Sequence, residues 1–181
     1  MSPVVEAVSR STAHGFSKTP QTSVHLIPGE GVEGDAHRGV TAQHLYVMRR
    51  DPTRPNFCQV HLFAAEMLDE LAAKGFNIAP GDLGENILTR NLDLLSLPLG
   101  TRLHLGAEAI VEVTGLRTPC SKIDDFRPGL QQHLWGERDA SDKRVRRAGI
   151  MSIVITEGDI RPGDAIQIEL PPHPHHPLGP V

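Results

Sequence analysis

The chain has few aromatic residues and few cysteines, and both shortages limit what it can be. Only 4% of its 181 residues are aromatic. Its two cysteines, Cys58 and Cys120, are too few for a disulfide framework and too far apart for a zinc site of the CxxC type. Each cysteine is therefore considered as a single thiol.

Two further absences exclude whole classes of protein. No stretch approaches the roughly 18 uninterrupted apolar residues of a membrane span, and the first residues lack the basic and apolar regions of a signal peptide. We therefore expect a cytoplasmic protein that does not bind a membrane. Acidic residues outnumber Lys and Arg by 22 to 18, so a general positive field is missing and we expect no nucleic-acid binding.

Glycine and proline, by contrast, are abundant. The 17 glycines and 15 prolines separate short apolar runs, which is typical of a turn-rich β protein. Eight or so strands with few helices suggest a β-barrel. The predicted strands are Val4–Val8, Ser23–Ile27, His44–Met48, Asn86–Leu88, Thr101–Leu105, Ala109–Thr114, Gly149–Thr156 and Ala165–Leu170.

One main amphipathic helix is predicted over Gln59–Lys74, because its apolar residues recur at helical spacing and Gly75 follows its end. Shorter helical turns are expected at Ser121–Phe126 and Pro128–Trp135. Residues Gly136–Arg147 are interpreted as a charged surface connection. The predicted class is therefore mainly β with some α.

The length predicts a single domain, which we place at residues 1–170. Residues 171–181 are rich in proline and histidine and contain little that can be buried, so they are expected to form a disordered tail. Histidines on such a tail can bind a stray transition metal, but a solvated tail without that role is the favoured interpretation.

Some motifs resemble known sites without the required context. Gly29–Gly34 matches GxGxxG, but no helical pattern follows it and its glutamates would repel a phosphate. Carboxylates beside glycine, such as Asp35, are explained by turn chemistry. The sequence contains neither a GxSxG nor an HExxH motif, which argues against a serine hydrolase and a zincin.

Cys120 lies where a thiol can be activated. It follows a predicted strand and a proline, starts a helical turn, and has Arg117 and Lys122 nearby. Positive charge and unpaired amides at a helix start favour the thiolate, which can be a nucleophile, a persulfide carrier or a ligand of a soft metal. A buried structural cysteine is the alternative that the local sequence leaves open. Cys58 has no Lys or Arg within three positions and is interpreted as structural.

Taken in order, several segments resemble the MOSC domain, named after the C-terminal domain of molybdenum cofactor sulfurases. The segment around Asn86 and the R-x-P-C segment are the more specific ones, and the resemblance extends from about residue 4 to residue 170. The residues that carry it are Gly31–Gly39 (GVEGDAHRG), Gly81–Ile87 (GDLGENI), Leu99–Gly106 (LGTRLHLG), Thr114–Cys120 (TGLRTPC) and Gly158–Asp164 (GDIRPGD).

The resemblance implies a MOSC-type β-barrel with a pocket for the molybdenum cofactor, a molybdopterin. It makes Cys120 both the catalytic residue and the molybdenum ligand. It implies that Asn86 and Glu85 line or brace the pocket. The remaining candidates for cofactor binding are Arg117, Thr118, His37 and Arg38. Pyridoxal phosphate is expected only on a partner desulfurase, not in this chain.

Three functions remain open at this point. The first is an oxidoreductase that reduces N-hydroxylated small molecules, as some free-standing bacterial members of the family do, with electrons from a separate electron donor. The second is a sulfur carrier or cofactor-binding module in which Cys120 receives a persulfide from a separate cysteine desulfurase and passes the sulfur to a metal cofactor. The third is a protein of the same fold that only binds a partner. Short edge strands are also compatible with a homodimer.

Overall fold

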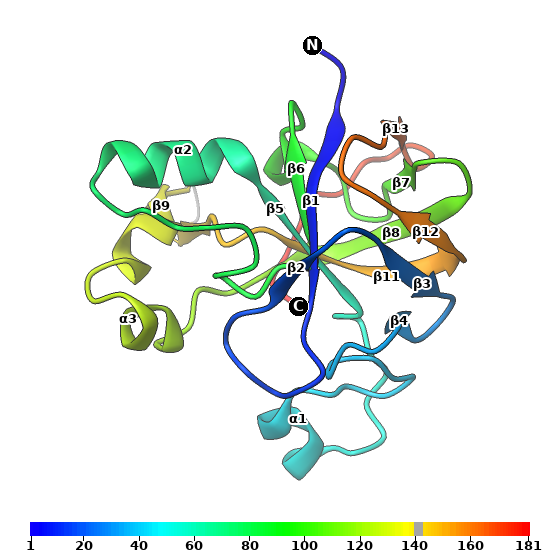
Figure 1. The fold of residues 1–181 in the computed structure, drawn as a ribbon, viewed down its shortest axis with the longest axis horizontal. Coiled ribbons are helices and arrows are strands. Elements are labelled where there is room, and N and C mark those ends of the chain that lie inside the picture. Colours follow the sequence, from blue (N-terminus) through cyan, green and yellow to red (C-terminus); the bar gives the residue numbers. More distant parts are fainter. Residues whose placement is uncertain (140–142) are drawn as a thin grey trace.

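The computed structural model describes residues 1–139 and 143–181, which form mainly short β-strands with a few short helices (Figure 1). This confirms the mainly β class with some α. The strands are β1 (Val4–Arg10), β2 (Thr19–Gln21), β3 (Val24–Ile27), β4 (Gly31–Val32), β5 (Val60–Ala64), β6 (Ile87–Arg90), β7 (Arg102–Leu105), β8 (Ala109–Leu116), β9 (Trp135–Arg138), β10 (Arg144–Arg146), β11 (Ile150–Thr156), β12 (Gly158–Ile160) and β13 (Ile166–Glu169). The helices are α1 (Leu45–Arg50), α2 (Ala65–Ala73) and α3 (Lys122–Phe126), with 3₁₀ turns η1 (Leu94–Ser96) and η2 (Gln131–Leu134). No described helix is long and apolar enough to cross a membrane.

The largest sheet has eight strands in the order β13-β7-β8-β11-β5-β6-β1-β2, with two smaller sheets, β12-β3-β4 and β10-β9. Within the large sheet β5 and β6 are parallel. A bridge between Val4 and Ala165 joins the start of β1 to the residue before β13, so the sheet curls toward its own first strands. The described strands do not establish a closed barrel, and the barrel stays a prediction.

The buried apolar side chains form two clusters. The first lies between one face of the large sheet and the small β12-β3-β4 sheet, with Val8, Leu26, Leu62 and Val111 among its members. The second lies between β5 and β6 and the helical side of the molecule, and includes Phe63, Leu71, Leu88, Ile123 and Leu134. The central strands are thus covered on both faces.

The predicted long helix over Gln59–Lys74 is wrong in its first half. Residues Val60–Ala64 are strand β5, which pairs with β11 and β6, and only Ala65–Ala73 are helical, as α2. Both faces of β5 are covered, and its residues are buried almost throughout, with apolar side chains on either side of His61. Periodicity alone does not distinguish such a run from a buried helix. The helix ends where predicted, since Gly75 takes the left-handed conformation with φ of 89°.

The strand predicted over His44–Met48 is also wrong, because Leu45–Arg50 are the helix α1. The amides of Val47 and Met48 donate hydrogen bonds to the carbonyl of His44, at 2.8 and 3.0 Å. In Figure 1, α1 projects from the lower end of the molecule, away from the large sheet. Among the described strands none pairs with these residues, and their backbone groups are satisfied locally within the helix.

The C-terminal residues, for which the sequence predicts disorder, lie against the sheet in this structure. The amide of Leu116 donates to the carbonyl of Gly179 at 2.7 Å, and the amide of Val181 donates to the carbonyl of Leu116 at 3.2 Å. Leu178 packs against the first core cluster. The prediction overlooked this one leucine and the unpaired end of β8, which together give the segment a place to bind.

The remaining predicted elements agree with the structure in kind, with ends that differ by a few residues. The other predicted strands correspond to β1, β3, β6, β7, β8, β11 and β13, and the predicted helical turns to α3 and η2. The predicted charged connection contains the hairpin β9–β10. Residues 140–142 of that connection lie outside the described residues.

Candidate functional site

A cavity of about 410 Å³ opens beside α1, a size within the usual range for ligand sites. Three separate parts of the chain form its walls: residues 14–18, residues 37–58 and residues 117–122. Five further residues complete it, namely His61, Gly84, Asn86, Met151 and Val181. Its exposed lining residues, such as Cys120 and Lys122, mark the mouth.

The permanently charged side chains that line this cavity all have one sign. Among the described lining residues, the permanently charged side chains are cationic: Lys18, Arg54, Arg117 and Lys122. Burial lowers the pKa of His44, which also lines the cavity, and nearby positive groups lower it further. The protein as a whole carries a net charge of −4, so the positive field is local and favours an anionic ligand at this place.

Asp35 lies behind the wall and holds several of its residues. Its side chain is only 2% exposed, and its Oδ2 accepts from Lys18 Nζ at 2.7 Å and from Asn86 Nδ2 at 3.1 Å. Its Oδ1 accepts from the backbone amide of His37 at 2.9 Å. Although burial alone favours the neutral form, the contacts from His37 and the charge of Lys18 hold the pKa of Asp35 well below its ordinary value.

Asn86 connects this carboxylate to the strands. Its Oδ1 accepts from the amide of His61 at 3.1 Å, and its Nδ2 also donates to the carbonyl of Ser9 at 3.2 Å. The next residue inward, Glu85, is 1% exposed and accepts from the amide of Gly81 through Oε1. Burial raises the pKa of Glu85, and its Oε2 has no hydrogen-bond partner in the structure. Asn86 thus connects Asp35 to the backbone of the cavity-lining His61, whereas Glu85 is bonded to the turn at Gly81.

Arg117 and His61 form the inner part of the cavity. Arg117 Nη1 donates to the carbonyl of Leu83 at 2.9 Å. Burial lowers the pKa of Arg117, an effect opposed by Cys120, Glu85 and Cys58. His61 is 4% exposed with its Nε2 at 2.9 Å from the carbonyl of Ala148. Burial and the charge of Arg117 hold the pKa of His61 well below its ordinary value, so its ring is neutral at neutral pH.

Both cysteines line the same cavity. Cys120 is exposed and its carbonyl accepts from the amide of Ile123 at 3.1 Å, which starts the turn into α3. Cys58 is half-buried, and burial raises the pKa of its thiol against the opposing charges of Arg54 and Arg117. The accessible thiol is thus Cys120, whereas Cys58 lies deeper in the wall.

Comparison with known proteins places this geometry in a family. The MOSC domain matches residues 37–167, which is more than half of the chain and contains most of the cavity. The chain belongs to the MOSC domain family. This family is associated with the molybdenum cofactor.

Solved structures agree with this MOSC fold. The YuaD protein of Bacillus subtilis is 23% identical with a TM-score of 0.74, over 95% of this chain and 98% of that one. The YiiM protein of Geobacillus stearothermophilus is 20% identical with a TM-score of 0.63, over 92% and 75% of the two chains. The YiiM protein of Escherichia coli is 17% identical, also at 0.63, over 97% and 73%. Among curated proteins, no sequence matches significantly.

Most residues expected to form the MOSC site lie together in the structure. The ones that line the cavity are Cys120, Asn86, Arg117, Thr118 and His37, while Glu85 is buried and is not among the lining residues. Thr118 Oγ1 accepts from Arg146 Nε at 3.0 Å. Their separation along the sequence is bridged by strands β5, β6, β8 and β11, which are neighbours in the sheet.

Arg38 does not join the other MOSC site residues. Its Nε lies 2.7 Å from Glu30 Oε2 at the exposed surface, and it is not among the residues that line the cavity. Because Asp35 accepts from the backbone of His37, the chain turns at this point and directs consecutive side chains to different places. Proximity in sequence to His37 therefore gave a wrong expectation for Arg38.

The sequence did not reveal several basic residues that line the cavity, nor the role of the buried aspartate that pairs with one of them. Lys18, Arg54 and His14 were not singled out, and Asp35 was interpreted only as a turn residue. The sequence around Lys18 and Arg54 contains no motif that could have identified them. For Asp35 a signal existed, because it lies within the GVEGDAHRG segment of the MOSC resemblance.

Proposed function

We propose that this protein binds the molybdenum cofactor in the cavity, with Cys120 as the thiolate ligand of the metal, and reduces N-hydroxylated small molecules. One observation carries the proposal: every permanently charged side chain described in the lining is cationic, and an exposed thiol lies at the mouth. The cofactor has an anionic phosphate and a soft metal, so this donor set fits both of its parts.

Different residues would contribute to cofactor binding in different ways. Arg117, Arg54 and Lys122 would hold the phosphate, because guanidinium and ammonium groups form charge-assisted hydrogen bonds with phosphate oxygens. Lys18 is a weaker candidate, since its ammonium group is already paired with Asp35 at 2.7 Å. Asp35 and Asn86 keep the wall in place, as their hydrogen bonds join three segments of the chain.

The bound cofactor would supply the two-electron chemistry that no side chain of this protein provides. The chain would supply the rest. Cys120 anchors the metal, the cations balance negative charge, and the apolar lining residues Phe16, Leu45 and Phe57 exclude water from one side. Electrons would come from a separate electron-donor protein that reaches the mouth beside Cys120.

A second candidate rests on the exposure of Cys120. An accessible thiol near Arg117 can also receive a persulfide from a separate cysteine desulfurase and pass the sulfur to a metal cofactor. This candidate needs the same thiol without a retained metal. The two functions therefore differ in the metal content of the purified protein.

The test measures molybdenum and pterin per chain in protein made in a host that synthesises the cofactor, for wild type, Cys120→Ser and the matched control Cys58→Ser. We expect near-stoichiometric molybdenum in wild type and Cys58→Ser, and little in Cys120→Ser. Reduction of an N-hydroxylated compound with a chemical electron donor should follow the metal content. Wild type without metal, despite a cofactor supply, would contradict the reductase. A persulfide on Cys120 in that metal-free protein would support the carrier instead.

A further inference from the structure

The structure contains an aspartate–histidine pair whose burial sets it apart from the other such pairs. His37 Nδ1 lies 3.4 Å from Asp35 Oδ1, and the Asp35 side chain is 2% exposed. Two other described histidines contact a carboxylate, His25 with Asp159 and His104 with Glu169, but those carboxylates are 57% and 53% exposed. A contact with a buried carboxylate is stronger because less water screens it.

Asp35 is fixed from several sides before it meets the His37 ring. Its Oδ2 accepts from Lys18, Asn86 and the amide of Ser11, and its Oδ1 accepts from the amide of His37 itself. A carboxylate with this many donors remains ionised and cannot rotate freely. It can therefore hold the histidine ring in one orientation, with Nδ1 as the protonated nitrogen facing the carboxylate.

The ring held in this way faces the proposed reaction site. His37 lines the same cavity as Cys120 and is about one-third exposed. The His14 ring lies edge-on to it at 5.2 Å, and the positive charge of His37 lowers the pKa of His44. With Nδ1 directed at Asp35, Nε2 is the nitrogen left to exchange a proton with a molecule in the cavity.

We propose that His37 is the proton donor of this site and that Asp35 is its positioning residue. The proposal rests on the proposed reductase function. Reduction of an N-hydroxylated compound consumes two electrons and two protons and yields the N–H compound and water. The N–O bond breaks and its electron pair leaves with the oxygen, which takes the Nε2 proton of His37 to form water. Two electrons from the separate donor protein supply the electron pair at nitrogen, and this pair binds a second proton that comes from solvent. Solvent also reprotonates His37.

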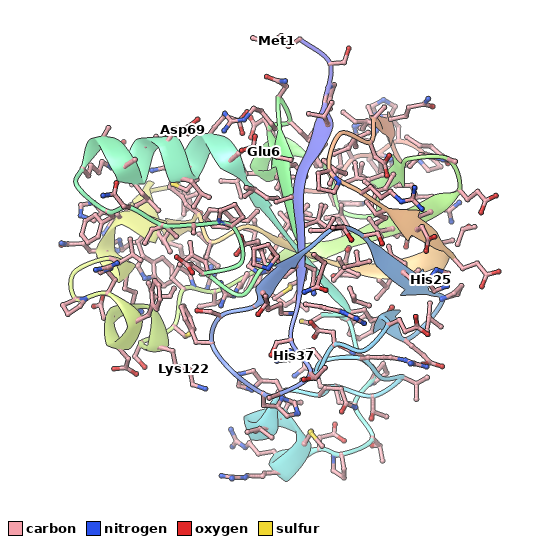
Figure 2. All side chains as sticks on the ribbon, in the orientation of Figure 1. Met1, Glu6, His25, His37, Asp69 and Lys122 are labelled. Atoms are coloured by element: carbon pink, nitrogen blue, oxygen red, sulfur yellow. The ribbon has the colours of Figure 1, made fainter. Side chains whose placement is uncertain are left out.

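The kinetic test compares His37→Asn with the matched control His25→Asn. His25 also pairs with an aspartate, but at the surface and away from the cavity, and Figure 2 shows it at a different edge of the molecule from His37. We expect His37→Asn to retain its molybdenum and pterin and its KM, and to lose roughly 10²- to 10⁴-fold in kcat. His25→Asn should keep the kcat of wild type.

Two results would overturn the proposal. A kcat for His37→Asn within threefold of wild type would mean that the ring delivers no proton that limits the rate. Loss of molybdenum and pterin from His37→Asn would assign the residue to cofactor binding instead. Wild type that retains the cofactor but reduces no N-hydroxylated compound would contradict the proposed function itself, which distinguishes that failure from a failure of His37 alone.

A second measurement needs no activity. Nitrogen NMR of the histidine rings in the cofactor-free protein, at alkaline pH where the rings are neutral, reports which nitrogen carries the proton. The signal of His37 is identified by its loss in His37→Asn. We expect the form protonated at Nδ1, because the carboxylate oxygen Oδ1 of Asp35 lies 3.4 Å from that nitrogen. The form protonated at Nε2 would show that Asp35 does not orient the ring and would overturn its positioning role.

Discussion

The buried ion pair between Lys18 and Asp35 gives a stability prediction that the structure makes quantitative. Lys18 Nζ and Asp35 Oδ2 are 2.7 Å apart, and the side chains of Lys18 and Asp35 are 5% and 2% exposed. In Lys18→Met, Asp35 remains as a buried anion that has lost its only lysine or arginine partner among the described residues. Removing one member of a buried pair costs about 3–5 kcal/mol. Neutral donors such as Asn86 remain on Asp35, so we expect the lower end, about 3 kcal/mol.

The matched control is Arg38→Met. The pair of Arg38 with Glu30 has the same 2.7 Å separation, but its side chains are 38% and 35% exposed. An exposed pair of this kind contributes about 0–1 kcal/mol, because water and salt screen it. For a chain of this length, about 3 kcal/mol corresponds to a fall of roughly 6–12 °C in Tm, against at most about 4 °C for Arg38→Met.

The assay is chemical denaturation at several pH values, because the loss depends on the ionisation of Asp35. Its folded pKa lies below the ordinary value of about 3.9, so the stability it contributes is present above that value and is lost as the pH falls below it. We expect the difference between wild type and Lys18→Met to be largest near pH 7 and to shrink as the pH falls, because protonation of Asp35 in the variant removes its unpaired buried charge. Equal losses for Lys18→Met and Arg38→Met at pH 7 would refute the argument that burial decides the strength of the pair.

Two further predictions concern the cavity wall. Iodoacetamide at neutral pH should alkylate the exposed Cys120 at least about tenfold faster than Cys58, because the Cys58 thiol is half-buried and burial raises its pKa. The two rates are measured by peptide mass spectrometry, with each Cys→Ser variant as control, and comparable rates would contradict this difference. In Gly115→Ala the new methyl group would lie 2.2 Å from Val181 Cγ2 and 2.6 Å from the carbonyl of Gly179, so the C-terminal segment should detach at a cost of about 1–3 kcal/mol. Hydrogen exchange of residues 176–181 measures this, and protection unchanged from wild type would show that the segment is not held against β8.

The strands show where sequence reasoning succeeds. Residues 109–114 alternate between buried and partly exposed positions in β8, and that alternation is visible in the sequence as a strand of period two. Strand β5 shows no such alternation, because apolar clusters cover both of its faces. Leu62 belongs to the first cluster and Phe63 to the second. Its burial depends on helices that come later in the chain, and no local pattern contains that information.

The candidate site likewise has features that the sequence predicts and one that it does not. Cys120, Asn86 and Arg117 belong to segments that resemble a family, so their meeting in one cavity could be expected from the sequence. The positive sign of the cavity could not, since Lys18, Arg54 and Lys122 come from three separate parts of a chain with a net charge of −4. Overall charge is a sum over the whole surface, whereas the field in a cavity depends on which few side chains the fold brings within a Debye length.

By itself the sequence determined the mainly β class, most strand positions and the family to which Cys120 belongs, because these depend on local alternation, turn residues and short motifs. Only the tertiary structure decided that Arg38 lies outside the site, that Asp35 anchors it and that the C-terminal segment lies against β8. The direction of Arg38 follows from a local turn and from its pair with Glu30 eight positions away. The other two features depend on contacts between residues far apart in the sequence. Such contacts exist only when the folded sheet brings its strands together, and a linear pattern does not record them.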